Sequence, residues 1–190
     1  MTGMITMALT GWLGVSLLML ALWVVHLAIR NAGIVDVGWA GGLALLGIYY
    51  AIAGHGHLPR AILVAGMSGI WGMRLACYLL ATRVIGQTEE GRYVELRRRW
   101  VTNVPLKFFL FFQFQAFLCV VLSVPFLAAS VNTCPGLPTV QWIGFGLWLV
   151  AFMGESTADF QLQAFKSNPA NRRLGRSVGG IAPRQFCCGR

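Results

Sequence analysis

Residues 4–29 read MITMALTGWLGVSLLMLALWVVHLAI, a run of 26 residues that contains no Asp, Glu, Lys or Arg. About 20 consecutive apolar residues are enough for a helix to cross the hydrocarbon core of a bilayer. A cleaved signal peptide would begin with a basic segment and have a shorter apolar core. We therefore interpret this run as a retained membrane span, which places the chain among membrane proteins.

Four further apolar stretches follow, so the sequence predicts an all-α, polytopic membrane helix bundle with about five transmembrane helices. The stretches are residues 34–53, 61–81, 108–129 and 140–165. The 190-residue chain is 57 % hydrophobic and 11 % charged, whereas soluble domains carry about 25 % charged residues. This composition excludes an ordinary soluble enzyme, a disordered tail and a disulfide-framed secreted module.

The positions of the basic residues predict an orientation in the membrane. The net charge of +9 comes from 15 Lys and Arg against 6 Asp and Glu. Six basic residues lie between the third and fourth spans and six follow the fifth, but the loop 131–139 contains none. Because Lys and Arg accumulate in cytoplasmic loops, we expect the N-terminus outside and the C-terminus in the cytoplasm. Basic residues placed at span ends also argue against a nucleic-acid partner.

Charged side chains inside apolar stretches are costly in a bilayer, so each is a candidate functional residue. Asp36 lies in the first turn of the second span, with Trp39 one turn later on the same face. The carboxylate suits either the helix dipole or a ligand pocket, and Trp39 can be an interfacial anchor. Arg74, Tyr78 and Thr82 recur every four residues, which predicts a stripe facing the bundle interior. Arg74 would then form a structural ion pair, for instance with Asp36, or part of an anion site.

The last two spans also carry polar side chains. Gln113 and Gln115 lie two residues apart and project to different sides, so interhelical hydrogen bonds are their expected role. Glu155, Asp159 and Lys166 share one helical face beside apolar residues. This pattern predicts a pocket wall at the cytoplasmic membrane surface.

No metal site is predicted, because the histidines and cysteines lack the spacing of metal ligands. We expect Cys77 and Cys119 to be small apolar filler within spans. His55 and His57 fall in a Gly- and Pro-containing turn and are expected to be solvated.

Five segments occur in series along the chain: NAGIVDVGW (31–39), RLACYLLATR (74–83), EEGRYVELR (89–97), QA (115–116) and DFQLQAFKSNPANR (159–172). In this order they resemble an uncharacterised bacterial membrane family of the steroid 5-alpha-reductase superfamily. The resemblance covers residues 30–173 and depends on the series, since no single segment is specific. It implies an oxidoreductase of the bacterial inner membrane that passes a hydride from NADPH to a carbon–carbon double bond conjugated to a ketone.

The resemblance also implies site residues and partners. The residues implied as catalytic are Tyr78, Glu90 and Tyr93. Those implied to bind the NADPH cofactor are Arg92, Asp159, Lys166 and Asn171. Those implied in the substrate pocket are Asp36, Trp39, Arg74 and Gln115. The implied partners are membrane lipids and an apolar lipid-like or steroid-like small molecule.

The chain departs from this family after residue 172, where relatives continue with a segment that contains an Arg-His-Pro-Asn-Tyr cofactor motif and with one or two further spans. The codons of residues 179–182, Gly-Gly-Ile-Ala, permit Trp-Arg-Tyr-Ser when read one base earlier, which favours a frameshift or truncation. We therefore expect an incomplete domain over 1–173, an aberrant or disordered tail over 174–190, no activity of this chain alone and only weak NADPH binding. Two alternatives stay open: an isoprenylcysteine-methyltransferase-like enzyme using S-adenosylmethionine, and a non-enzymatic membrane protein that binds lipid or scaffolds a partner.

Overall fold

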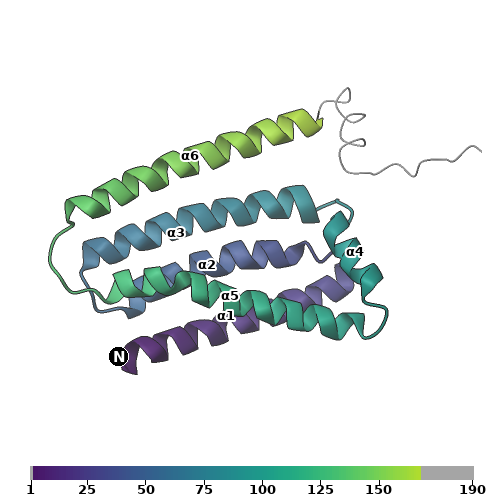
Figure 1. Ribbon diagram of the computed structural model, residues 1–190, viewed down its shortest axis with the longest axis horizontal. Helices are drawn as coiled ribbons and strands as arrows, with labels where there is room; N and C mark the ends of the chain where they lie inside the picture. Colours follow the sequence, from purple (N-terminus) through teal and green to yellow (C-terminus); the bar gives the residue numbers. More distant parts are fainter. Residues whose placement is uncertain (1, 168–190) are drawn as a thin grey trace, which may run out of the picture. The chain divides into compact units, whose positions relative to one another are not determined.

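Helices account for every regular element in residues 2–167, the part of the chain that the computed structural model describes (Figure 1). They are α1 (Thr2–Ile29), α2 (Ile34–Ala53), α3 (Leu58–Leu79), the π-helical turn η1 (Leu80–Val84), α4 (Gly91–Arg99), α5 (Val104–Val131) and α6 (Thr139–Ser167). The predicted all-α class is confirmed. The predicted tail over 174–190 lies outside the described residues.

Four helical stretches are long and apolar enough to cross a membrane: Gly3–Ile29, Ile34–Ala53, Leu58–Val84 and Val104–Val131. They correspond to the first four predicted spans and support a multi-pass membrane protein. The fifth predicted stretch forms the single helix α6 but is not among the four. Its C-terminal half carries Glu155 and Asp159, which lower its mean hydropathy.

The chain divides into two compact units, Met1–Pro138 and Thr139–Arg190. The described part of the second unit is α6. Along this helix the rings of Phe145, Trp148 and Phe152 stack in sequence, with centroids 6.0 and 5.2 Å apart. Aromatic side chains three and four residues apart thus form a continuous ridge on α6.

In the first unit α1, α2, α3 and α5 form a bundle in which α2 contacts all three of the others (Figure 1). Small residues allow the close approach of α2 and α3. A Cβ atom added to Gly72 would lie 2.6 Å from the carbonyl oxygen of Ala40, and one added to Gly47 would lie 2.0 Å from Ser68 Oγ. Such glycine contacts are a common basis of helix association in membranes.

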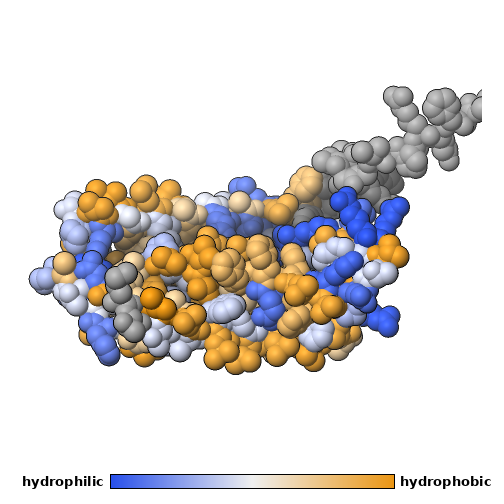
Figure 2. All heavy atoms as spheres, turned by 60° about the horizontal axis from the view of Figure 1, so that its bottom comes forward, coloured by the Kyte–Doolittle hydropathy of each residue, from blue (hydrophilic) through white to orange (hydrophobic). Residues whose placement is uncertain are grey.

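One end of this bundle, which we call the basic end, consists of residues 26–36 and 80–107. There α1 and α3 finish, α2 and α5 begin, and α4 lies between η1 and α5. Figure 2 shows apolar side chains over the middle of the molecule and polar ones gathered at the end that carries α4. The helix α4 was not predicted, although Glu90 at its start and three arginines in its last turn suit the helix dipole.

The opposite end, the loop end, consists of residues 53–61 and 127–138. Its arginine, Arg60, is only 3 % exposed and donates to the carbonyl oxygens of Asn132 and Gly136, both at 3.0 Å. His57, predicted to be a solvated turn residue, is half-buried and also has a structural contact. Its Nε2 accepts a hydrogen bond from the Gly136 N–H at 3.3 Å, which joins two loops, whereas His55 is exposed as expected.

Candidate functional site

Asp36, in the first turn of α2, accepts hydrogen bonds from three side chains at the basic end. Its Oδ1 accepts from the Tyr93 hydroxyl at 2.9 Å. Its Oδ2 accepts from Arg92 Nη2 and, at 3.4 Å, from Arg83 Nη1. The carboxylate therefore joins α2 to η1 and to α4.

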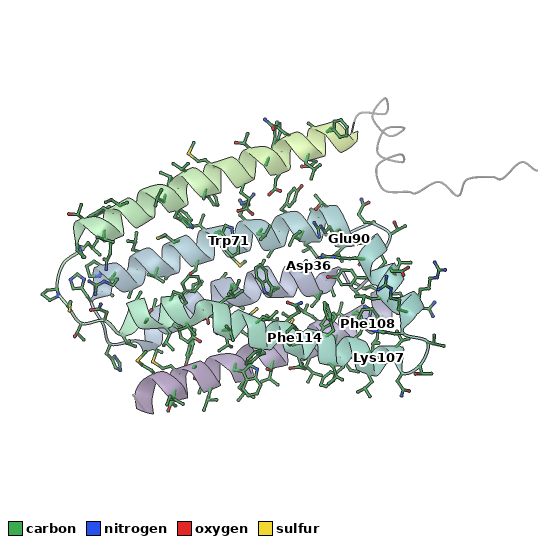
Figure 3. All side chains as sticks on the ribbon, viewed as in Figure 1. Asp36, Trp71, Glu90, Lys107, Phe108 and Phe114 are labelled. Atoms are coloured by element: carbon green, nitrogen blue, oxygen red, sulfur yellow. The ribbon has the colours of Figure 1, made fainter. Side chains whose placement is uncertain are left out.

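Glu90 completes the arrangement as a second acceptor. Its Oε2 accepts from Arg83 Nη1 and from Arg92 Nε, each at 3.0 Å. Two carboxylates and two guanidinium groups thus alternate, and we call these four residues together with Tyr93 the Asp36 network. Figure 3 shows Asp36 and Glu90 at the same end of the bundle, one at the start of α2 and the other beside α4.

Arg83 reaches this network from a widened helical turn. The Ile85 N–H donates to the carbonyl oxygen of Leu80 at 2.9 Å, a spacing of five residues in place of four. Such π-helical turns often occur at functional sites. The sequence suggested Arg74 as the partner of Asp36, but the structure gives that role to Arg83 and Arg92.

Tyr93 is the most enclosed member of the network, at 2 % exposure. Burial, and then the neighbouring Asp36 carboxylate, raise the pKa of its hydroxyl above the ordinary value. The guanidinium carbon of Arg92 lies 4.7 Å from the centroid of its ring. Tyr93 is therefore held as a neutral phenol that can donate one hydrogen bond.

A second ionic group lies beside the network and centres on Glu89. Arg97 binds its carboxylate in a fork, with Nε and Nη2 at 3.2 and 2.9 Å, and the Ala32 N–H donates at 2.9 Å. Burial alone would raise the pKa of Glu89, but these hydrogen bonds outweigh burial and lower it. Glu89 therefore anchors the segment before α4 to the connection between α1 and α2.

Arg83, Glu89 and Arg97 were not predicted as site residues. The available signal was the mixture of acidic and basic residues in 83–99, which indicated a solvated loop as readily as a folded ionic network. The π-helical turn brings Arg83 to Asp36 on α2, and α4 brings Arg97 to Glu89, which accepts from the Ala32 N–H just before α2.

Of the predicted pocket residues, Asp36 is the centre of the network, whereas Trp39, Arg74 and Gln115 lie outside it, as does the predicted catalytic residue Tyr78. Trp39 packs edge-on against Trp71, with ring centroids 6.2 Å apart. Arg74 and Tyr78 are half-buried on α3, and Gln115 is half-buried on α5.

The other α5 glutamine, Gln113, follows the prediction of interhelical bonding. It donates from Nε2 to the carbonyl oxygen of Ser16 at 3.3 Å. This contact fastens α5 to α1 within the apolar part of the bundle.

The structure does not bring the four predicted cofactor-binding residues together. Arg92 belongs to the Asp36 network, and Asp159 is half-buried on α6 in the second unit. The side chain of Lys166 and the whole of Asn171 lie outside the described residues. Only Arg92 is therefore placed with the predicted catalytic residues Glu90 and Tyr93.

Two hollows open on the first unit. One, of about 450 Å³, lies at the basic end and is lined by His26, Leu27, Arg30, Glu89 and Arg97. The other, of about 230 Å³, is largely apolar and lies between α1 and α2, lined by Thr10, Gly11, Gly14, Val15, Leu18, Leu45, Leu46 and Tyr49.

The cysteines on the spans differ in exposure, and the possible metal ligands are dispersed in the described part of the chain. Cys119 is buried, as expected of a small apolar side chain in a span, whereas Cys77 is exposed on α3. Among residues 2–167 there is no group of three or more His, Cys, Asp or Glu side chains that could hold a metal ion.

Comparison with known proteins identifies a family for this chain. The model of a family described as a protein of unknown function, DUF1295, matches residues 22–179. No curated protein and no solved structure matches the chain.

Proposed function

The chain belongs to the DUF1295 family, and on this premise we propose that it is a membrane reductase that uses NADPH to reduce a carbon–carbon double bond conjugated to a ketone. The proposed substrate is lipid-like or steroid-like, since the chain is built almost entirely of apolar helices. The proposed site is the Asp36 network, and the proposed location is the cytoplasmic side of a bacterial inner membrane, where basic loops accumulate.

The observation that carries the proposal is the hydrogen bond from the Tyr93 hydroxyl to Asp36. Reduction of an enone places negative charge on the ketone oxygen, and a neutral phenol stabilises that charge by donating a hydrogen bond. Tyr93 has one proton to donate, so the ketone oxygen would take the place of Asp36 as its acceptor. Arg83 and Arg92 would continue to hold Asp36 during this exchange.

The donor set at the basic end suits the phosphate groups of NADPH. This end carries seven Lys and Arg side chains against four Asp and Glu side chains. Arg83 and Arg92 are 38 % and 50 % exposed, so their guanidinium groups are accessible from water. Arginine is well suited to bind phosphate through paired hydrogen bonds. When bound, NADPH supplies the hydride.

Glu90 has a positioning role in this proposal. Its carboxylate bridges Arg83 and Arg92 and fixes the separation of their guanidinium groups. Residues held in this way bind a ligand with less loss of side-chain entropy. Tyr78 on α3 and Asp159 on α6 remain candidates for the same reaction, on the strength of the resemblance alone.

The test is fluorescence titration of NADPH into the detergent-solubilised protein, with S-adenosylmethionine titrated in parallel. We expect selective NADPH binding weaker than micromolar, since micromolar affinity requires about 8 kcal/mol and exposed arginine contacts contribute only about 0–1 kcal/mol each. The variant Arg92→Gln should weaken NADPH binding. The matched control Glu95→Gln changes a separate, exposed pair with Arg99 and should leave binding unchanged.

Each other outcome points to a different function. Binding of S-adenosylmethionine without NADPH would support the methyltransferase alternative. Absence of binding by both nucleotides would support a non-enzymatic lipid-binding or scaffold protein. Effects of similar size and opposite sign, weaker binding in Arg92→Gln and tighter binding in Glu95→Gln, would show that NADPH responds to surface charge and does not use the Asp36 network.

A further inference from the structure

A histidine near the end of the first membrane span is left with an unused polar atom. His26 is 1 % exposed, and its ring packs against Phe108 and Phe112 of α5, with centroids 4.9 and 5.7 Å apart. Its Nδ1 atom is buried and makes no hydrogen bond within the part of the chain that the structure describes. Buried polar atoms are nearly always paired, so an isolated one indicates a missing partner.

The same side chain lines the hollow of about 450 Å³ at the basic end. Arg30, which follows α1, also lines it and has a left-handed backbone with φ of 52°. Residues other than glycine rarely adopt this backbone conformation, except where the surrounding structure requires it. Here the conformation ends α1 and leaves an exposed guanidinium group at the rim of the hollow.

The charge of the hollow is positive. Glu89 neutralises Arg97 through the two hydrogen bonds of the fork. Arg30 has no carboxylate partner among residues 2–167 and therefore provides an uncompensated positive charge. An anion entering the hollow would meet this charge together with the imidazole of His26.

The hollow also borders an apolar surface. Leu27 is one of its lining residues and is 42 % exposed, and Val24 and Ile29 nearby on α1 are 55 % and 45 % exposed. These residues belong to a helix long and apolar enough to span a membrane. A ligand here would place an anionic group among Arg30 and His26 and an apolar chain along α1.

We propose that this hollow binds the phosphate of an anionic phospholipid, with Arg30 as the main cation and the imidazole of His26 as a neighbouring polar group. Basic pockets at the ends of membrane helices are suited to anionic headgroups. The site is distinct from the Asp36 network, and its function would be to hold an annular lipid at the junction of α1, α4 and α5.

The experiment is native mass spectrometry of delipidated protein in detergent, titrated with phosphatidylglycerol or with phosphatidylcholine of the same acyl chains. We expect roughly fivefold tighter binding of phosphatidylglycerol, in line with one additional lysine or arginine contact at a membrane surface. Equilibrium dialysis with inorganic phosphate forms the second arm and tests a headgroup-free anion. Neither arm contains NADPH, so failure here is independent of the reductase proposal.

Two variants test the site itself. Arg30→Gly removes the guanidinium group and suits the left-handed backbone, and His26→Phe keeps an aromatic ring beside Phe108 but removes both ring nitrogens. Each should abolish the preference for phosphatidylglycerol. The control Arg98→Gln removes an arginine that is 84 % exposed and does not line the hollow, and it should keep the preference.

Three results would overturn the proposal. One is an unchanged lipid preference in both Arg30→Gly and His26→Phe. Another is an equal loss in Arg98→Gln, which would indicate general surface charge. The third is Arg30-dependent binding of inorganic phosphate without any preference between the two lipids, which would assign the hollow to a soluble anion.

Discussion

The two ends of the α1, α2, α3 and α5 bundle use arginine in different ways. At the basic end the arginines bind carboxylates, as Arg83 and Arg92 bind Asp36 and Glu90. At the loop end, where no Asp or Glu occurs, Arg60 binds backbone carbonyl oxygens. One end is therefore held by ion pairs between side chains, and the other by a side chain that caps the main chain.

This difference has consequences for stability. A carboxylate can be protonated and its pairing is screened by salt, whereas a carbonyl oxygen keeps its acceptor role over the whole accessible pH range. Arg60 is buried, whereas the arginines of the Asp36 network are partly in water. We expect the loop end to be the more stable end and the basic end to be the one that responds to pH, salt and ligands.

The largest effect is expected from Arg60→Met, which tests the loop end. The substitution removes two hydrogen bonds from a buried guanidinium group: Asn132 keeps only the His57 N–H as donor to its carbonyl oxygen, and the Gly136 carbonyl oxygen loses its donor. It should lower the free energy of unfolding by about 3 kcal/mol. The measurement is unfolding in mixed detergent and SDS at two pH values. A loss that varies strongly with pH would contradict the proposed difference between the ends.

A smaller effect is expected from Asp36→Asn at the basic end. The amide can still accept from Tyr93, but Arg83 and Arg92 lose one of their two carboxylates, at a cost of about 2 kcal/mol. The same unfolding assay measures it. Because the network is partly exposed, added salt should reduce the difference between wild type and variant, and a salt-independent difference would place the network in a fully enclosed environment.

Acidification should weaken the basic end before the loop end. The pKa of Glu89 is lower in the folded protein than in the unfolded chain. The contribution of Glu89 to folding stability is therefore complete above the ordinary carboxyl pKa of about 4.5. It is lost as the pH falls through the folded pKa. Losing its charged hydrogen bonds should cost about 1 kcal/mol. Hydrogen exchange, corrected for the intrinsic pH dependence, should show faster exchange of the Ala32 amide and α4 in acid.

The variant Glu89→Gln is the control for that experiment. It should remove the acid sensitivity of the Ala32 amide while leaving exchange at the loop end as in the wild type. Earlier loss of protection at the loop end would reverse the comparison.

The smallest effect is expected from Glu95→Gln. Glu95 lies on the exposed side of α4 and pairs with Arg99 at 2.9 Å, and exposed pairs of this kind contribute little to stability. The pKa of Glu95 is lowered, chiefly by the Arg99 hydrogen bond. We expect no measurable change in unfolding, and a clear loss would show that α4 is held to the bundle through its outer face.

The sequence was sufficient for the long helices but insufficient for α4, for the π-helical turn and for the full site. Long apolar runs gave α1, α2, α3 and α5 to within a few residues, because helix length in a bilayer is fixed by its thickness. Asp36, Glu90, Arg92 and Tyr93 were predicted as site residues, and the structure places them in one hydrogen-bonded network.

The features that the sequence did not predict depend on tertiary contacts. Arg83 could not be assigned to Asp36 from residue spacing, because the apolar pattern of the third span does not predict the widened turn at Leu80–Val84. The α4 helix is short and charged, and without the anchoring of Glu89 to Ala32 its sequence is equally typical of a solvated loop. The role of His57 depends on a loop some 80 residues away in the chain.

The widened turn η1 also determines how the chain would respond to the deletion of a single residue. A π-helical turn holds one residue more than a regular turn, so loss of a single residue within Leu80–Val84 would leave an uninterrupted α-helix. The span would survive such a deletion, and the residues beyond the turn would keep their direction, but the side chains inside the turn, Arg83 among them, would take new positions around the helix axis. Arg83 would then leave Asp36 and Glu90. The bundle and the ionic network could thus be separated by one codon, and η1 is the place where a chain could keep its membrane fold while losing its site.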